Sequence, residues 1–435
     1  MPLRFQNTLT QQLEDFKPLD GKTVRMYTCG PTVYSYVHIG NFRTFSFQDI
    51  LRRTLRARGF TLDHVMNITD VEDKIIRNAI QHNQSIQEYT AKYTEAFLAD
   101  SATLRLERPE RLVFATEHIT EMAEAIDKLT ASNHTYESDG SVYFRIGSFP
   151  TYGRLSKINL AGNIAGARVD VDEYEKDDAR DFVLWKARKP GEPAWPASCG
   201  EGRPGWHIEC SVMAMKYLGE TIDIHTGGVD LIFPHHENEI AQSEALTGKQ
   251  FVRYWLHAEH LMVEGQKMSK SLGNFYTLRD ILDKGYSPES VRYLLVSAPY
   301  RKQLNFTFDA LTGAAASIAR LRNFELRVSG GVFPDGENPE MSARAAQALA
   351  AFDAALDDDL NTADALAAVF EYIRDANTAM DSGDFLSANK ASARALLDRF
   401  DSIFDVLKPT VAESSISDEQ IESLIAERTQ AKKSK

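Results

Sequence analysis

Cysteine is scarce in this chain, with three residues in 435, at positions 29, 199 and 210. So small and odd a number argues against a disulfide framework and favours reduced thiols, used as metal ligands or buried as small apolar groups. No apolar run approaches the roughly 20 residues that a membrane-spanning helix needs. The first residues lack the basic start and apolar stretch of a signal peptide. We therefore expect a cytoplasmic protein without membrane contact.

Basic residues are not in excess either: the chain has 49 Lys and Arg against 62 Asp and Glu, which gives a net charge of −13. This balance argues against a general nucleic-acid coat protein, although local basic patches could still hold a nucleic-acid substrate. Internal repeats and low-complexity tracts are absent from the sequence. A chain of this length is too long for one core and predicts about two to four domains.

The first clear structural pattern is a strand, a helix and a second strand. Residues 24–29 predict a short strand, apolar spacing predicts a helix over 38–58, and residues 61–67 predict the next strand. Gly59 is the expected C-cap of the helix. A βαβ unit of this kind implies a parallel sheet with a crossover helix, and hence an α/β fold.

His38-Ile39-Gly40-Asn41 stands at the start of that helix. Free N–H groups and the positive end of the helix dipole favour anions there. Gly40 would let a base or phosphate approach the backbone, and His38 could donate to a phosphate oxygen. Taken alone, four residues fit an ordinary helix start with an exposed histidine better than they fit a ligand site.

His235 and Glu239 are four residues apart, so a helix would place the imidazole and the carboxylate on one face. With the thiols of Cys29 and Cys210 they make a mixed sulfur, nitrogen and oxygen set that favours zinc over magnesium or calcium. The four residues are dispersed, so their spacing alone gives little specificity. We interpret Cys199, in a polar glycine-rich loop, as a non-ligand.

Three further segments carry polar groups that suit a ligand. Thr69 follows the second strand, where parallel sheets bind ligands, and Asp70 and Asp73 are interpreted as caps of the next helix. Asp230 follows a predicted Gly-Gly turn and could accept from a ribose hydroxyl, although such a turn more often only reverses the chain. Lys267-Met268-Ser269-Lys270-Ser271 predicts a cationic loop that closes on a polyphosphate, or else a plain surface loop.

Together these segments resemble class I aminoacyl-tRNA synthetases, and the match to the cysteinyl-tRNA synthetase family runs from about Phe5 to Arg428. His38–Asn41 resembles the HIGH signature, with Asn41 in place of the second histidine. Residues 267–271 match the KMSKS signature unaltered. The segments around Cys29, around Cys210 and over residues 233–239 resemble the three metal-binding segments of the family.

The resemblance implies a Rossmann-type catalytic domain in two halves, with further regions inserted in it and following it. We expect the first half at 1–120, an inserted connective domain at 121–200 and the second half at 201–260. A KMSKS loop and stem-contact region would follow at 261–327. Helical spacing beyond residue 339 predicts an α-helical bundle, and the resemblance puts this 328–435 region on the anticodon side, cut short at the C-terminus.

The resemblance also implies an activity and its residues. L-cysteine would be activated by ATP with Mg²⁺ and transferred to tRNA-Cys by a monomeric enzyme. One Zn²⁺ would be bound by Cys29, Cys210, His235 and Glu239, and Thr69 and Trp206 would line the cysteine pocket. ATP would be bound by His38, Gly40, Asn41, Asp230, Lys267 and Lys270, with His38 and Lys270 catalytic. Two alternatives are an ATP-dependent cysteine–aminosugar ligase of mycothiol synthesis and a non-catalytic paralogue.

Overall fold

A computed structural model of the chain describes residues 2–158, 181–269, 272–410, 423 and 427. The central strands are β3 (Thr23–Thr28), β4 (Thr61–Ile68), β5 (Arg111–Phe114), β10 (Ile222–Gly228) and β11 (Val252–Ala258). They form a parallel sheet in the order β11-β10-β3-β4-β5. The strand order reverses at the β3–β10 pair, since β4 and β5 follow on one side and β11 on the other. Such a reversal is the switch point at which α/β sheets bind ligands. The predicted α/β class with a parallel sheet is confirmed.

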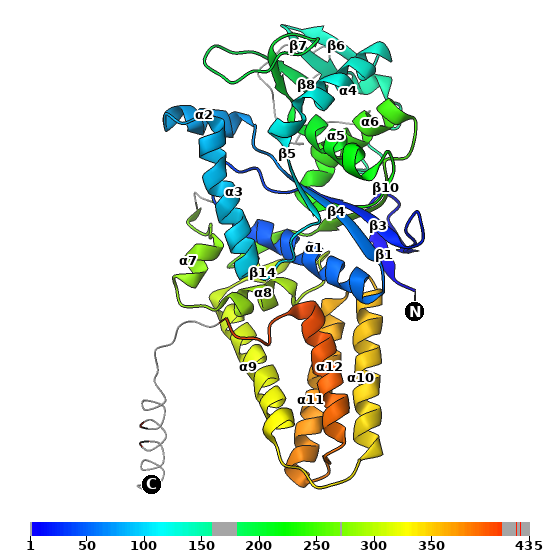
Figure 1. Cartoon of the computed structure of the whole chain (residues 1–435), viewed down its shortest axis with the longest axis vertical. Helices are drawn as coiled ribbons and strands as arrows, with labels where there is room; N and C mark the ends of the chain where they lie inside the picture. Colours follow the sequence, from blue (N-terminus) through cyan, green and yellow to red (C-terminus); the bar gives the residue numbers. More distant parts are fainter. Residues whose placement is uncertain (1, 159–180, 270–271, 411–422, 424–426, 428–435) are drawn as a thin grey trace.

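Helices cover both faces of this sheet (Figure 1). They are α1 (Ile39–Ala57) on one face, and α4 (Ile119–Ala131), α5 (Trp206–Leu218) and α6 (Glu237–Thr247) on the other. Successive side chains of β3 point to opposite faces of the sheet. Val24 and Met26 pack on the α1 side, whereas Tyr27 and Cys29 pack with α5 and α6. Cys29 therefore faces the helices that carry the other predicted metal ligands.

The predicted βαβ unit is present. α1 begins after His38, whose side chain accepts from the Asn41 N–H, and it ends before Arg58. β4 continues one residue past the expected strand. The caps of the next helix, α2 (Asp73–Gln81), were predicted wrongly: Glu72 is its N-cap, whereas Asp70 accepts from the backbone and hydroxyl of Thr116.

A small antiparallel sheet stands at one end of the molecule, at the top of Figure 1. Its order is β6-β7-β8-β9, with β6 (Thr135–Ser138), β7 (Ser141–Phe144), β8 (Phe182–Ala187) and β9 (Gly202–Pro204). Before it come α2 and the long α3 (Ile86–Thr103), which has a Ser85–Glu88 capping box. Residues 165–169, whose sequence indicates a loop, and the acidic run 170–178 lie outside the described residues.

Helices fill the opposite end of the molecule (Figure 1). The bundle is made of α9 (Phe308–Gly330), α10 (Pro339–Asp357), α11 (Thr362–Ser382) and α12 (Asn389–Phe404).

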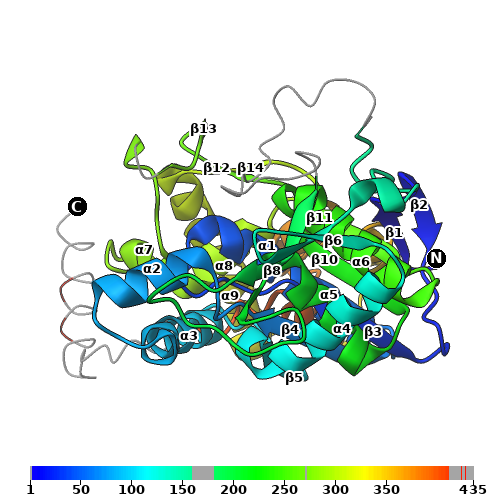
Figure 2. The same ribbon diagram turned by 90° about the horizontal axis from the view of Figure 1, so that it is seen from above.

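Between the bundle and the central sheet lie the small strands β12 (Leu261–Val263), β13 (Gln266–Lys267) and β14 (Leu304–Phe306) and the helices α7 (Leu278–Leu282) and α8 (Pro288–Val296). In the view of Figure 2 these strands and α7 lie away from the N-terminal hairpin of β1 (Arg4–Asn7) and β2 (Gln12–Asp15). Residues 418–433, where the sequence predicts a further helix, fall almost entirely outside the described residues. Among the described residues, no helix is both long enough and apolar enough to span a bilayer.

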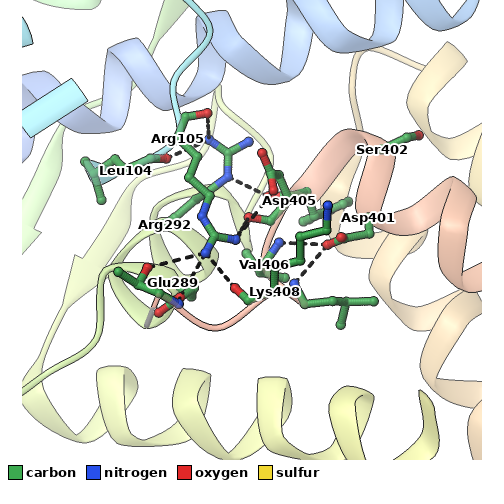
Figure 3. Close-up of polar contacts among 12 residues, drawn as sticks. Leu104, Arg105, Glu289, Arg292, Asp401, Ser402, Asp405, Val406 and Lys408 are labelled. Atoms are coloured by element: carbon green, nitrogen blue, oxygen red, sulfur yellow. Dashed lines mark hydrogen bonds and ion pairs between the residues drawn. The ribbon is translucent and has the colours of Figure 1, made fainter. Parts of the chain in front are cut away.

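Two arginines, one fully buried and one half-buried, tie α1 and α8 to the bundle. Arg292 of α8, which is fully buried, donates to Asp49 of α1 at 2.5 Å and to the Phe404 carbonyl at the end of α12 at 2.5 Å. Arg105 donates to Glu289 and to the Asp405 carbonyl (Figure 3). Charge-assisted bonds of this kind fix geometry, so α1 has a defined position relative to α8 and α12.

A buried histidine on the α1 side of β4 makes stability depend on pH. His64 is 1 % exposed; Nδ1 lies 2.7 Å from Arg52 Nη1 and Nε2 lies 2.9 Å from Thr28 Oγ1. Arginine only donates, so Nδ1 accepts and Nε2 carries the proton. Burial, followed by the charge of Arg52, lowers the pKa of His64 to about 3.

Acidification is therefore expected to destabilise the protein through His64. Below the ordinary pKa of about 6.5 the unfolded chain binds a proton that the folded chain refuses, which costs about 2 kcal/mol of unfolding free energy between pH 7 and pH 5. Urea unfolding at both pH values should show a smaller loss in His64→Gln than in the parent chain. Equal losses in the two proteins would refute this assignment.

Candidate functional site

Four side chains from separate parts of the chain meet on the α5–α6 face of the central sheet. Cys29 directly follows β3, Cys210 lies in α5, His235 precedes α6 and Glu239 lies in its first turn. Each is at most 8 % exposed. One ligand atom of each lies within 4.8 Å of the others. The fold thus brings together the dispersed residues that the sequence suggested as metal ligands.

The separations within this cluster test whether it could hold a metal. Cys29 Sγ lies 3.9 Å from Cys210 Sγ and 3.8 Å from Glu239 Oε1, and His235 Nε2 lies 3.1 Å from Glu239 Oε1. Bonds of roughly 2.0 Å to nitrogen or oxygen and 2.3 Å to sulfur give tetrahedral edges of about 3.3–3.8 Å. The four groups therefore fit a tetrahedrally coordinated metal ion.

The electrostatics of the cluster point the same way. Burial and the neighbouring Cys210 raise the pKa of the Cys29 thiol well above its ordinary value. Burial also opposes charge on Cys210, but the hydrogen bond with Cys29 and the charge of His235 lower the pKa of Cys210 to about 6. The two sulfurs do not ionise together unless a cation lies between them. A divalent transition-metal ion such as Zn²⁺ would remove this conflict because it binds cysteines as thiolates.

Two histidines outside the cluster orient its members. His207 Nδ1 lies 2.8 Å from His235 Nδ1, and His225 Nε2 lies 2.9 Å from Glu239 Oε2. If His235 Nε2 binds a metal, Nδ1 carries the proton and donates to His207. The contact with His225 holds Oε2 and leaves Oε1 of Glu239 facing the sulfurs. Outer partners of this kind fix the ring orientation and basicity of metal ligands.

A second set of donors shares two members with the first: Cys29, His225, His236 and Glu239 also lie within 4.8 Å of one another. His236 Nε2 is 3.4 Å from Cys29 Sγ, and its Nδ1 is 2.8 Å from His257 Nε2. The second set offers one sulfur where the first offers two. His236 and His225 also have hydrogen-bonding roles beside the first set, so we favour the first set as the metal site.

Replacing His225 is expected to loosen metal binding without unfolding the site. His225→Asn removes the hydrogen bond that holds Glu239, and losses of outer partners typically cost about 10–100-fold in metal affinity. Competition with a chromophoric chelator would measure the change, with the exposed His82→Asn as the matched control. Parent-like affinity in His225→Asn would show that the contact has no such role.

The two residues suggested for the cysteine pocket lie beside this cluster. Trp206 begins α5, and its ring centroid lies 4.2 Å from that of His235. Thr69 is 1 % exposed and donates to Glu209 Oε2 at 3.1 Å. Trp206 is positioned to form a wall next to a metal-bound group. The Thr69 hydroxyl is already engaged by the residue that precedes Cys210.

The predicted ATP-binding segments meet at the N-terminus of α1. The His38 ring caps the helix by accepting from the Asn41 N–H at 3.2 Å, and it packs edge-on against Phe275. A Cβ atom at Gly40 would lie 2.9 Å from Met268 Cε and 3.0 Å from His38 Nδ1. The start of the KMSKS segment therefore lies over the HIGH segment, and a side chain at Gly40 would have to displace the flexible end of Met268.

The remaining suggested ATP residues are placed in part. Lys267 is exposed in β13, and Lys270 lies outside the described residues. Asp230 lies close to the backbone of Gly228, near α1. A Cβ atom added at Gly228 would clash with the Asp230 carboxylate and would lie 3.7 Å from Thr44 Oγ1 of α1. The expected Gly-Gly turn was wrong, because Gly227 and Gly228 are the last residues of β10. A Cβ atom at Gly227 would meet the His236 ring at 2.6 Å, which explains the glycine there.

Comparison with known families agrees with this fold. Residues 15–316 match the class I (C) tRNA synthetase catalytic domain, and residues 351–408, which cover the end of α10, α11 and α12, match the DALR domain. These matches place the chain among the class I tRNA synthetases.

Curated relatives define the family more closely. The chain is 65 % identical to a cysteine–tRNA ligase of Solibacter usitatus, over 100 % of this chain and 93 % of the relative. It is 53 % identical to a cysteine–tRNA ligase of Koribacter versatilis, over 100 % of this chain and 94 % of the relative. The chain therefore belongs to the cysteine–tRNA ligase family, and the resemblance inferred from the sequence is confirmed.

Solved structures show the same fold at low sequence identity. A Mycobacterium tuberculosis methionyl-tRNA synthetase in complex with methionyl-adenylate aligns with a TM-score of 0.64 at 15 % identity, over 89 % of this chain and 90 % of that chain. A putative arginyl-tRNA synthetase of Campylobacter jejuni aligns with a TM-score of 0.58 at 14 % identity, over 90 % of this chain and 93 % of that chain.

Proposed function

We propose that this chain activates L-cysteine with ATP to form cysteinyl-adenylate and then transfers the cysteinyl group to the 3′ end of tRNA-Cys. The observation that carries the proposal is the buried cluster of two thiols, an imidazole and a carboxylate beside the switch point of the sheet. Full-length identity of 65 % to a cysteine–tRNA ligase supports it. The aminosugar ligase and the non-catalytic paralogue have no comparable support.

Cys29, Cys210, His235 and Glu239 would hold one Zn²⁺. Zinc prefers a thiolate to a hydroxyl and lowers the pKa of a bound thiol, so it would supply the distinction between cysteine and serine. A pocket that relied on size alone would separate the two by only about 10²-fold. Trp206 and Thr69 would line the same pocket and hold the amino acid against the zinc ion.

The N-terminus of α1 would bind ATP together with Mg²⁺. His38 and Lys270 would stabilise the phosphates as pyrophosphate leaves, with Lys267 adding positive charge. Gly40 would allow the nucleotide to approach the backbone, and Asn41 would donate an uncharged hydrogen bond where the family signature has histidine. Asp230 would accept from the ribose or the amino group. The carboxylate of the substrate is itself the nucleophile, so no side chain needs to attack.

The other regions would serve the tRNA. We assign the two halves of the catalytic domain to 1–120 and 201–260, with 121–200 as the connective insertion. Residues 261–327 would carry the KMSKS loop and contact the tRNA stem, and the bundle of 328–435 would lie on the anticodon side. A cytoplasmic monomer is the form we expect to act.

Pyrophosphate exchange followed by a choice of acceptor tests the proposal. The purified chain should exchange pyrophosphate into ATP only when cysteine is present, and it should charge a tRNA-Cys transcript. Exchange without tRNA charging, but with ligation of an aminosugar acceptor, would establish the mycothiol-type ligase instead. Absence of cysteine-dependent exchange in a metal-loaded protein would point to the non-catalytic paralogue.

A further inference from the structure

A cavity lies on the opposite side of the central sheet from the metal cluster. Its volume is about 200 Å³, and α1, the second half of α3 and the strands β4 and β5 enclose it. Most of its wall is apolar, formed by Phe45, Met66, Phe97, Leu106, Pro109 and Leu112. Ala102 and Arg108 also line it and are exposed, so the cavity reaches the surface.

One side chain in this cavity has no structural explanation within the described residues. Gln48 of α1 is 2 % exposed, and neither its amide nitrogen nor its amide oxygen has a hydrogen-bond partner there. The buried hydroxyl oxygen of Ser101 is unpartnered in the same way. A buried polar group left unsatisfied costs about 1–3 kcal/mol. An amide at this position therefore weakens the fold unless something in the cavity pairs with it.

The buried charges around the cavity are already paired. Arg52 lies 2.8 Å from Glu110 and 2.7 Å from His64, and Asp49 lies 2.5 Å from Arg292. A charged ligand would have to break one of these pairs or stay uncompensated in an apolar site, which is costly. The occupant that suits the cavity is therefore neutral and mostly apolar, with polar groups that face Gln48.

We propose that this cavity binds a neutral, flat heteroaromatic molecule of purine size, with its hydrogen-bonding edge on Gln48. A glutamine amide donates and accepts side by side, and this is how glutamine reads the N6–N7 edge of adenine. An apolar cavity of about 150 Å³ admits benzene, so a cavity of about 200 Å³ has room for a second small ring. The site is separate from the nucleotide site at the start of α1 and does not rest on the proposed function.

Adenine, purine and 7-deazaadenine serve as the probes. The full metal-loaded chain is titrated calorimetrically with each one after the catalytic site has been filled with a non-hydrolysable analogue of cysteinyl-adenylate. Adenine is expected to bind with one equivalent per chain. Purine lacks the amine and 7-deazaadenine lacks the N7 acceptor, so each should bind at least about tenfold more weakly.

Two variants connect binding to the cavity. Gln48→Leu should lose at least about tenfold in adenine affinity, while its melting temperature stays the same or rises; Gln87→Leu, at an exposed glutamine of α3, should bind as the parent does. Ala102→Phe, at the exposed edge, should block entry and gives a second test if Gln48→Leu does not fold. Absence of adenine binding, equal binding of the three probes, or parent-like affinity in both cavity variants would overturn the proposal.

Discussion

Cys29→Ala is expected to remove the metal and, with it, cysteine activation. The side chain contributes one of the two sulfurs of a buried cluster, and among the described residues Cys210 is the only other thiol in it. A bound metal that orients the substrate typically lowers the free energy of the transition state by several kcal/mol. Its loss should therefore reduce the rate of cysteine-dependent pyrophosphate exchange on the order of 10³-fold. Zinc content should drop from one equivalent to near zero.

The third cysteine provides the matched control for this experiment. Cys199 is half-buried in the loop before β9 and belongs to neither donor set. Cys199→Ala should keep a full equivalent of zinc and parent-like exchange. If Cys29→Ala kept its zinc, Cys29 would be removed from the site, and the second donor set would be excluded as well because it uses the same sulfur.

His38→Asn is expected to lower the rate of adenylate formation on the order of 10²-fold, the usual cost of removing one group that stabilises transition-state charge. The substitution separates two roles of this residue. His38 caps α1 through a hydrogen bond from the Asn41 N–H, and asparagine is itself among the best N-caps. The stability of His38→Asn should therefore match that of the parent, while catalysis is lost.

His38→Ala completes the comparison, because alanine cannot cap the helix. It should lose the same activity and, in addition, about 1 kcal/mol of unfolding free energy. Both variants should keep one equivalent of zinc, since His38 belongs to neither donor set. Undiminished pyrophosphate exchange in His38→Asn would show that the residue is only a helix cap.

Local patterns in the sequence predict much of this fold. The spacing of apolar residues in 38–58 and the glycine at 59 predict α1 and its end, because helix period and capping are local properties. The same holds for the helices of the C-terminal bundle. The wrong predictions arose where a tertiary contact decides the outcome. Asp70 pairs with Thr116 instead of capping a helix, and β10 extends through Gly228 because it pairs with β11.

The metal ligands were suggested by residue types and by resemblance, but their surroundings were not. Four further histidines surround these ligands: His207, His225, His236 and His257. Their contacts depend on how β10, β11, α5 and α6 pack together, and the sequence does not show that packing. Gln48 gave no signal at all: it reads as one polar residue on α1, and only the packed structure reveals that its amide is buried without a partner.

The central claim is that the sulfur of the substrate joins a metal that this chain holds through two sulfurs of its own. X-ray absorption at the zinc edge counts those sulfurs directly in the metal-loaded protein. The count should be two per zinc without substrate, three with saturating cysteine, and two again when serine replaces cysteine. A count that stays at two with cysteine bound would contradict the account.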